Sequence, residues 1–356
     1  MRVALVCPYS LSAPGGVQGQ VLGLAAALRT RGHEAIVVAP FDGTRPEPDG
    51  IIAVGRSIRI PVNGSIAAMA PLPGPVARAV HNLRRGDFDV VHLHEPLAAS
   101  ITMAALAGRV GPVVGTFHAA GDRTPYRWIG PLLRPLAGRI DRRVAVSEPA
   151  RRLAERYLGG TYEVLFNGVD VSSFDGGAPV PVDRPTILFL GRHEQRKGLE
   201  VLLLAMAHLP DEVRLSIAGH GPLTGSLRRR YGDDRRIEWL GQLDETNKIA
   251  RLHAASVVCV PSLHGESFGV TVLEAMAART PVVASDLAGY RQLAADGAAL
   301  LVPPGHPNQL AAGLLAVLRD PVLAARLSEL GCQQARRFSI DQLARRYISI
   351  YETIAS

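Results

Sequence analysis

The chain has 356 residues, a length that suggests two domains. Of these residues, 47% are hydrophobic and 20% charged, a composition that excludes a disordered protein. Its net charge of +7 is concentrated in residues 1–170, which hold 19 arginines against 13 acidic residues. A basic half of this kind favours an acidic partner such as phosphate, anionic lipid or nucleic acid. Solubility together with an arginine-rich coding bias explains the same charge, and composition alone favours this simpler explanation.

The three cysteines, Cys7, Cys259 and Cys332, are widely separated, which argues against a disulfide framework and for a reducing compartment. The apolar core of the first ten residues is too short for a signal peptide. The longest weakly polar run, residues 97–108, is well below the roughly 20 residues that cross a bilayer. We therefore expect a cytoplasmic protein, one that can still lie peripherally on the inner face of the cell membrane.

Strands alternate with helices along the first half of the chain. Apolar runs predict strands at 2–8, 33–40, 87–96, 111–118 and 162–170, apolar periodicity predicts helices at 17–29 and 97–108, and residues 142–158 read as a strand followed by a capped helix. This alternation predicts a parallel, doubly wound sheet covered by helices on both faces.

The same rhythm restarts after residues 175–185, which are rich in glycine and proline and read as a linker. Further strands are predicted at 186–191, 213–219, 237–241, 257–261, 281–286 and 298–304. We therefore predict two Rossmann-like α/β domains, residues 1–170 and 171–338, with the ligand in a cleft between them. A last helix, in residues 339–356, can pack on either domain, the first included.

Gly15 and Gly16 lie between the first strand and the first helix, where glycine lets the backbone approach a ligand at a helix N-terminus. With Gly19 they do not have the spacing of the dinucleotide-binding fingerprint. A tight turn explains the glycine pair as well as binding does.

A basic loop follows the first strand of the second half, with Arg192, Arg196 and Lys197. The chain has 37 arginines but two lysines, Lys197 and Lys248, and both follow strand ends. A compact ammonium donor suits a diphosphate, which gives a reason to keep lysine where arginine is so common. For Arg196, a place on the solvated rim is an equally good interpretation.

Residues 262–279 read as a glycine-bearing loop followed by a helix that begins near Phe268 or Gly269. The first N–H groups of a helix have no internal partner, so this arrangement predicts an anion site. Glu266 nevertheless stands at its mouth, and Glu274 follows within the helix. Taken alone, Glu266 reads as an ordinary helix-start acid and Glu274 as a solvent-facing helix residue.

These motifs together resemble the retaining glycosyltransferases of family 4, which have the GT-B fold. The resemblance covers essentially the whole chain and is carried by "GRHEQRKG" (191–198), "GQLDETNK" (241–248), "HGESFGVTVLEAMA" (264–277) and "PVVASD…GAALLVPPG" (281–305). Within the family, "VCPYS", "PGGVQ", "HEP" and "TFH" of the first half are most similar to actinobacterial enzymes that transfer mannose from GDP-mannose to phosphatidyl-myo-inositol.

The resemblance implies a role for each motif residue. The N–H groups of Ser267, Phe268 and Gly269 would face the diphosphate, Glu266 would bind hydroxyls of the donor sugar, and Glu274 would bind those of the ribose. The implied donor-binding set is Gly15, Gly16, Arg192, Arg196, Lys197, Leu243, Lys248, Glu266, Ser267, Phe268, Gly269, Val270 and Glu274. His118, with Glu266 the implied catalytic pair, would stabilise positive charge at the anomeric carbon or orient the sugar.

The implied acceptor pocket consists of Tyr9, Gln18 and Asn63. The lipid-specific members of the family also have a tyrosine and two arginines where this chain has Val62, Ala68 and Ala70. A soluble polyol or sugar is therefore the alternative acceptor. Two basic segments that carry apolar residues, 75–87 and 123–143, fit contact with an anionic membrane and fit equally a buried helix with a charged rim.

No cofactor or metal beyond the nucleotide sugar is expected. The Asp87-x-Asp89 pair precedes its strand. His92 and His94 lie near Glu95 but flank a strand end and lack a third clear metal ligand. Three rival functions are less favoured. A nucleotide-sugar epimerase needs further acid–base carboxylates, a non-catalytic binding protein has no need of His118 with both glutamates, and nucleic-acid binding lacks aromatic platforms.

Overall fold

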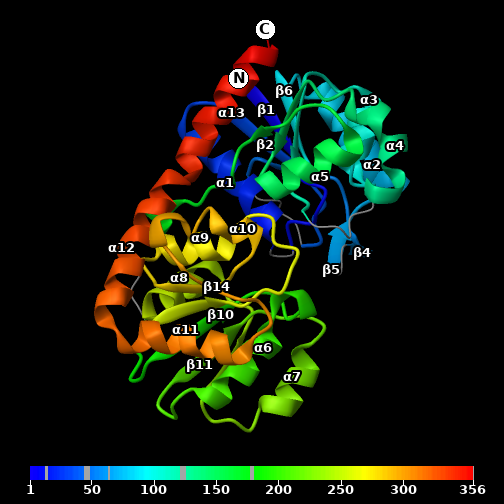
Figure 1. The fold of residues 1–356 in the computed structure, drawn as a ribbon. Helices are drawn as coiled ribbons and strands as arrows, with labels where there is room; N and C mark the ends of the chain where they lie inside the picture. The colour runs from blue at the N-terminus through cyan, green and yellow to red at the C-terminus, as the bar shows by residue number, and fades with distance from the viewer. Residues whose placement is uncertain (13–14, 44–48, 63–64, 121–125, 177–179, 356) are drawn as a thin grey trace. The chain divides into compact units, whose positions relative to one another are not determined.

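The computed structural model describes residues 1–12, 15–43, 49–62, 65–120, 126–176 and 180–355. The chain forms two compact units (Figure 1), of which one comprises Met1–Gly168 with Ile340–Ser356 and the other Val169–Ser339. The second unit thus begins ahead of the predicted linker at 175–185, and the C-terminal helix belongs to the first unit.

The first unit is built on a seven-stranded parallel sheet in the order β3-β2-β1-β6-β7-β8-β9. Its strands are β1 (Arg2–Val6), β2 (Glu34–Ala39), β3 (Ile51–Ala53), β6 (Val90–His94), β7 (Val113–Phe117), β8 (Arg142–Ala145) and β9 (Glu163–Val164). Every residue of β6 and β7 is buried. This is expected of central parallel strands that are covered on both faces.

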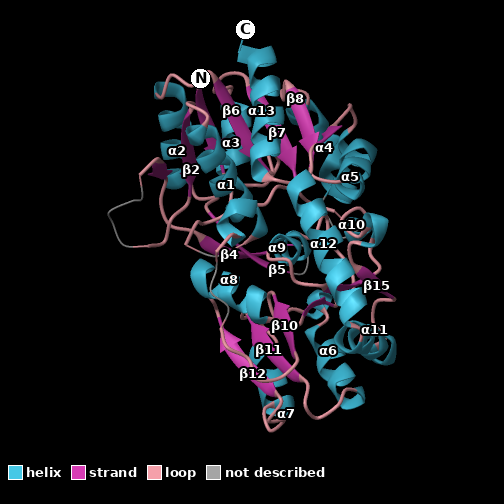
Figure 2. Ribbon diagram, turned by 90° about the vertical axis from the view of Figure 1, so that its left-hand side faces the viewer, coloured by secondary structure: helices cyan, strands magenta, loops and turns pink. Residues whose placement is uncertain are grey.

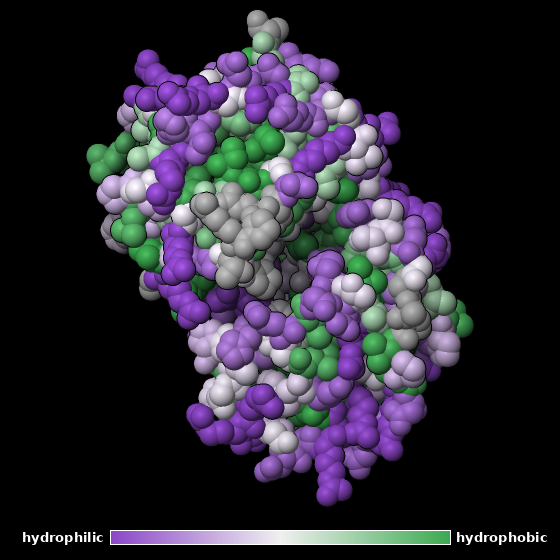
Figure 3. Space-filling model, turned by 180° about the vertical axis from the view of Figure 1, so that it is seen from behind, coloured by the Kyte–Doolittle hydropathy of each residue, from purple (hydrophilic) through white to green (hydrophobic). Residues whose placement is uncertain are grey.

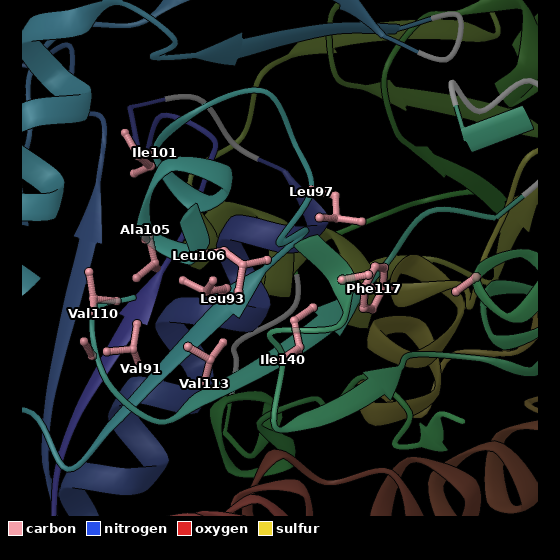
Figure 4. Close-up of a cluster of buried hydrophobic side chains, with 14 of the residues drawn as sticks. Val91, Leu93, Leu97, Ile101, Ala105, Leu106, Val110, Val113, Phe117 and Ile140 are labelled. Carbon is pink, nitrogen blue, oxygen red and sulfur yellow. The ribbon is translucent and has the colours of Figure 1, made fainter. Parts of the chain in front are cut away.

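Helices cover both faces of this sheet: α1 (Gly16–Thr30), α2 (Pro73–Arg85), α3 (Ile101–Gly108), α4 (Tyr126–Ala137), α5 (Glu148–Leu158) and α13 (Ile340–Ala355). Alternate residues of β1 enter different cores, as the period of two in a strand requires. Val3 and Leu5 pack with α1 and α13, whereas Ala4 and Val6 face α2, α3, α4 and α5. Figure 4 shows part of the core between this sheet and α2, α3, α4 and α5, with Val91, Leu93, Ile101, Leu106 and Phe117 among its side chains.

An antiparallel hairpin of β4 (Ile58–Val62) and β5 (Ser65–Met69) stands apart from the main sheet. The sequence analysis did not predict it, because its short strands have no strong apolar run. Tyr9 forms an isolated antiparallel bridge with Met69, and the Ser10 N–H donates to the Ala68 carbonyl at 2.8 Å. The hairpin therefore lies against the residues that follow β1.

Two of the predicted boundaries were wrong. The strand expected at 162–170 is only β9 (Glu163–Val164), because the Gln20 side chain binds both the Gly168 N–H, at 2.8 Å, and its carbonyl, at 2.7 Å. The helix expected from residue 97 begins at Ile101, after a turn in which the Ala98 N–H donates to the Glu95 carbonyl. In both places hydrogen bonds specific to the fold replace the regular ladder.

The C-terminal helix α13 is attached to the sheet of the first unit by two buried tyrosines. The Tyr351 hydroxyl is 2.7 Å from Nδ1 of His92, and the Tyr347 hydroxyl is 2.9 Å from Oγ1 of Thr116. Figure 1 shows α13 beside α1, with which it packs. A helix far along the sequence thus completes the core of the first unit.

Replacing Tyr351 by phenylalanine should lower the free energy of unfolding by about 1–3 kcal/mol, because it leaves a buried nitrogen of His92 unsatisfied. The change can be measured by urea denaturation of the full chain. Tyr231→Phe is the matched control, because the buried Tyr231 hydroxyl has no hydrogen-bond partner among the described residues. Equal losses in the two variants would contradict a stabilising role for the Tyr351–His92 bond.

The second unit has a six-stranded parallel sheet in the order β12-β11-β10-β13-β14-β15. Its strands are β10 (Thr186–Leu190), β11 (Arg214–Ala218), β12 (Ile237–Gly241), β13 (Val257–Val260), β14 (Val282–Ser285) and β15 (Leu300–Val302). Each of the six falls within its predicted range. Figure 2 shows β10, β11 and β12 side by side in this sheet.

The helices of the second unit connect these strands. They are α6 (Leu199–Ala205), α7 (Thr224–Tyr231), α8 (Glu245–Ala254), α9 (Val270–Ala277), α10 (Ala288–Arg291), α11 (Pro307–Arg319) and α12 (Pro321–Arg337), with 3-10 turns η1 (Val171–Phe174), η2 (Gln195–Lys197), η3 (Met206–His208) and η4 (Ala295–Gly297). A core of aliphatic side chains from β10, β11, α6 and α11 fills one face of the sheet. The loops after β10, β12 and β13 carry the predicted donor-site residues.

Candidate functional site

The loop after β10 holds two arginines on one buried carboxylate. Glu194, whose side chain is 3% exposed, accepts hydrogen bonds from Nε of Arg192 at 2.6 Å and Nε of Arg196 at 3.1 Å. The interpretation of Arg196 as a solvated rim residue was therefore wrong, since its side chain is only 20% exposed and contacts two carboxylates. Glu194 was not predicted as a site residue, although an acid between basic residues after a strand was a signal for it.

Glu266 is the second carboxylate of this cluster. Its Oε1 lies 2.7 Å from Nζ of Lys197 and 3.0 Å from a terminal nitrogen of Arg196. Burial alone raises the pKa of Glu266, but the Lys197 and Arg196 cations outweigh it, and the pKa falls below its usual value. Glu266 is therefore an ionised, ion-paired carboxylate, not an exposed helix-start acid.

Glycines allow the loops after β10 and β13 to approach each other closely. Gly198 has φ of 68°, and a Cβ there would lie 1.9 Å from the Pro261 carbonyl oxygen. The Leu263 N–H also donates to the Arg196 carbonyl at 2.7 Å. These contacts place Lys197 beside Glu266, which is 69 positions later in the sequence.

The glycine before α9 fixes the start of that helix. Gly269 is the N-cap, with φ of 104°, and a Cβ there would lie 2.7 Å from the Tyr290 ring. The helix begins at Val270, next to the predicted start at Phe268 or Gly269. Its first N–H groups follow Ser267 and the buried Phe268.

Lys248 lies in the first turn of α8 and not, as predicted, in a strand-end loop. Asp244 caps this helix by accepting from the Asn247 N–H at 2.8 Å, and Leu243 precedes it, half-buried. Nζ of Lys248 lies 2.7 Å from Oε1 of Glu274 and 2.6 Å from Oε1 of Glu245. Burial lowers the pKa of Lys248, but the Glu274 and Glu245 carboxylates outweigh it and hold the pKa above its usual value.

The second unit therefore holds two groups of cations and carboxylates, one from the loops after β10 and β13 and one from the helices α8 and α9. Glu274 is 19% exposed and faces Lys248, so the interpretation of Glu274 as a solvent-facing residue was wrong. The arrangement offers ammonium and guanidinium groups to an anion and carboxylates to hydroxyl groups.

In the first unit, His118 follows β7 and is 8% exposed. Its ring Nε2 lies 2.9 Å from Nδ1 of His94, and its backbone N–H donates to Oε1 of Glu95 at 2.8 Å. Burial lowers the pKa of His118 to about 3, so the ring is neutral at physiological pH. Burial raises the pKa of Glu95 to about 7, against the effect of its backbone hydrogen bonds.

The amino end of α1 lies at the same edge of this sheet. Gly15 is the N-cap in an extended conformation, and a Cβ on Gly16 would meet no atom of the described residues within 4 Å. Space thus remains at an N-terminus whose first turn carries no acid. Gln18, half-buried, donates from Nε2 to the Ser10 carbonyl at 3.3 Å.

Tyr9 lies just before this turn. Burial raises the pKa of its hydroxyl above the usual value, and the Glu95 carboxylate raises it further, so Tyr9 is protonated. Asn63 lies outside the described residues. Ala70 is 1% exposed and belongs to the hydrophobic core, so position 70 presents no group to a ligand.

No group of three or more potential metal ligands occurs in the described ranges. The cysteines Cys7, Cys259 and Cys332 are buried and unlinked. Asp89 accepts from the Arg2 N–H at 2.6 Å, at the amino end of the sheet and away from His118.

Comparison with known proteins decides the family. Residues 14–173 match the family model "Glycosyltransferase Family 4", and residues 174–334 match "Glycosyl transferases group 1". The chain belongs to the family 4 glycosyltransferases. It is 42% identical over 373 residues to the phosphatidyl-myo-inositol mannosyltransferase of Mycobacterium tuberculosis strain H37Rv, covering 100% of this chain and 97% of that protein. The corresponding protein of Mycobacterium leprae is 40% identical over 365 residues, with 100% and 98% covered.

A solved structure shows the same fold. The sucrose-phosphate synthase of Thermosynechococcus elongatus superposes with a TM-score of 0.78 at 22% identity, covering 99% of this chain and 98% of that one. The expected GT-B fold of two Rossmann-like domains is confirmed, and this member of family 4 is a glycosyltransferase.

Proposed function

We propose that this glycosyltransferase moves mannose from GDP-mannose to phosphatidyl-myo-inositol, with retention of configuration at the anomeric carbon. The observation that carries the proposal is the 40–42% identity, over the full chain, to enzymes named for transfer of mannose to this lipid. The cation–carboxylate cluster of the second unit supplies the chemistry that a nucleotide-sugar donor needs.

The second unit would bind the donor. Arg192, Arg196, Lys197 and the N–H groups that open α9 would stabilise the diphosphate as it leaves, because they present positive charge and N–H donors to it. Glu274, with Lys248, would accept hydrogen bonds from the ribose. Leu243 and Val270 would contact the nucleotide, and Gly15 and Gly16 of the first unit the sugar-diphosphate.

Glu266 and His118 would act at the sugar. A double displacement needs a nucleophilic carboxylate and a second carboxyl group about 5–5.5 Å from it. In the described part of the donor site, Glu266 is bound to Lys197 and Arg196, and Glu274 is bound to Lys248. Both are engaged in ion pairs, which favours a front-face transfer through an oxocarbenium-like state over a covalent intermediate.

The acceptor would lie beside Tyr9, Gln18 and the open space at Gly16. A protonated Tyr9 and the amide of Gln18 can each donate to and accept from inositol hydroxyls. The buried Ala70 lends weight to the second candidate acceptor, a soluble polyol or sugar, because this position cannot hold a lipid phosphate.

Two helices on the same face of the first sheet fit an anionic membrane surface. The exposed side of α2 carries Arg78, His81, Arg84 and Arg85.

Figure 3 shows one face of the molecule, on which hydrophobic side chains form separate groups among hydrophilic ones. None of the helices in the described ranges is long and apolar enough to cross a bilayer, so contact would be peripheral.

The exposed side of α4 adds apolar groups to this surface. Trp128 is 79% exposed and Leu132 81%, while Tyr126 and Gly130 on the opposite side are buried. Residues 126–140 carry three arginines and no acid. Exposed aromatic and aliphatic side chains flanked by arginines are typical of helices that lie in a membrane interface.

The chain should bind phosphatidylinositol vesicles and not neutral ones, because each basic residue near an anionic surface contributes about 1 kcal/mol. Binding should weaken with salt, since the field decays over about 8 Å at physiological ionic strength. A Trp128→Ala/Leu132→Ser double variant should pellet less with the vesicles, and Val322→Ser, an equally exposed residue of the second unit, should not change pelleting. No pelleting of the wild-type chain at low salt would favour the soluble acceptor.

Transfer should survive EDTA, because the donor's diphosphate has Lys197 and two arginines as counter-charges. The assay is mannose transfer before and after chelation. Loss of activity that magnesium or manganese restores would show that a metal takes part.

The proposed function is tested by offering labelled GDP-mannose, UDP-glucose and UDP-N-acetylglucosamine with phosphatidylinositol vesicles or free inositol. We expect lipid-linked mannose from GDP-mannose alone. Product only with free inositol would replace the acceptor, and product only from a UDP-sugar would replace the donor.

A further inference from the structure

Two residues at the end of β6, His94 and Glu95, contact His118. His94 is the last residue of that strand and contacts the His118 ring, and Glu95 follows and binds its backbone. Both side chains are almost fully buried, with exposed fractions of 2% and 6%. Strands β6 and β7 are neighbours, with His94 opposite Thr116, which brings these residues together.

The hydrogen bond between the two rings fixes the position of one proton. Both imidazoles are neutral, since burial lowers the pKa of His94 well below its usual value and that of His118 to about 3. Nε2 of His94 is buried and has no partner in the part of the chain that the structure describes. A proton on this nitrogen would be a buried donor without an acceptor, and buried N–H groups without a partner are rarer in proteins than unpaired acceptors. The proton of His94 therefore sits on Nδ1 and is donated to Nε2 of His118.

The proton of the His118 ring follows from this bond. A neutral imidazole has one N–H group, and the bond made by one nitrogen decides which nitrogen carries it. Because Nε2 of His118 accepts from His94, its own proton is on Nδ1. The ring then offers an N–H donor to an oxygen of the substrate.

The His94 ring is itself held in place by His92, on which it stacks with centroids 4.3 Å apart. Both nitrogens of His92 are occupied, Nδ1 by the Tyr351 hydroxyl and Nε2 by Oγ1 of Thr116, each at 2.7 Å. Helix α13 thus supports the ring that contacts His118.

Glu95 holds the other side of His118. It has φ of 50°, a conformation that costs a non-glycine residue about 1–3 kcal/mol and persists where the surroundings fix it. Its N–H donates to the Thr116 carbonyl at 2.8 Å, and its carbonyl accepts from Oγ1 of Thr102 at 2.9 Å. Its Oε1 accepts the His118 N–H at 2.8 Å, so the backbone from which the ring projects is fixed.

We propose that His94 and Glu95 are positioning residues for His118, with Glu95 fixing its backbone and His94 fixing its ring proton on Nδ1. Of the two roles expected for His118, this arrangement selects orientation of the sugar by a hydrogen bond from a neutral ring. The inference rests on the proposed function for its effect on catalysis, but the position of the proton can be measured without any substrate.

The first experiment is nitrogen NMR of the full chain labelled with ¹⁵N-histidine, with His118→Ala identifying the His118 signals. We expect the shift of a protonated nitrogen at Nδ1 of His118 and of an unprotonated one at Nε2. The reverse pattern in the wild-type chain would overturn the proposal, whatever reaction the enzyme catalyses.

Variants then separate positioning from folding. His94→Ala should change the His118 nitrogen pattern and lower kcat about fivefold with KM for the donor unchanged, because one neutral hydrogen bond is worth about 1 kcal/mol. Glu95→Ala should lower kcat by a similar factor. Glu95→Gln should retain much of the wild-type kcat, because the side-chain amide oxygen can still accept the backbone N–H of His118.

His253→Asn is the matched control, because it changes a half-buried, hydrogen-bonded histidine of the second unit. It should leave the His118 nitrogen pattern as in the wild type. A pattern altered as strongly by His253→Asn as by His94→Ala would contradict the role of His94. An unchanged pattern and kcat in His94→Ala would do so as well.

Discussion

Replacing His118 by alanine should lower kcat about a hundredfold while the Kd for GDP stays within a factor of two, as expected when one preorganised donor is removed. The reason is that His118 belongs to the first unit, whereas the predicted nucleotide contacts lie in the second. Steady-state kinetics with GDP-mannose and calorimetry with GDP measure the two effects separately.

His208→Ala is the control for this variant, since His208 is an exposed histidine of the second unit. It should leave both constants unchanged. Thermal denaturation should accompany the kinetics, because His118 is buried and its loss can destabilise β7. A correctly folded His118→Ala variant with wild-type turnover would remove His118 from the mechanism.

Lys197→Ala and Glu274→Ala should each weaken donor binding, with Kd raised about 30-fold, because truncating one partner of a buried charge pair costs at least about 2 kcal/mol. Lys197 supplies a cation to the diphosphate, and its loss removes one of the two cations that pair with Glu266 among the described residues, the other being Arg196. Loss of Glu274 removes a hydroxyl acceptor and leaves the buried ammonium of Lys248 with the exposed Glu245.

Arg230→Ala is the matched control for both, because Arg230 forms an exposed ion pair with Glu200 in the same unit. Calorimetry with GDP-mannose should show wild-type affinity for this variant. Unchanged donor affinity in both Lys197→Ala and Glu274→Ala would refute the assignment of the donor to the second unit.

The class of the fold and most of the strands could be predicted from the residue pattern. Central strands such as β1, β10 and β13 are mainly apolar, because parallel strands are covered on both faces. The start of α9 was also predictable, since a glycine at the helix start and apolar residues at helical spacing are local signals. The family followed from the motifs in these strand-end loops.

Contacts between side chains of distant segments could not be predicted, because the residue pattern carries information on local structure alone. The ion pair of Lys197 with Glu266 depends on the close approach of two loops at Gly198. The same approach brings Arg196 into contact with Glu266, so Arg196 does not lie on the solvated rim. The stacked histidines and their bond to His118 depend on the register of β6 against β7. The C-terminal helix was free to join either unit by its pattern alone, and the buried hydrogen bonds of Tyr347 and Tyr351 place it on the first, because a polar group is buried where it finds its partner.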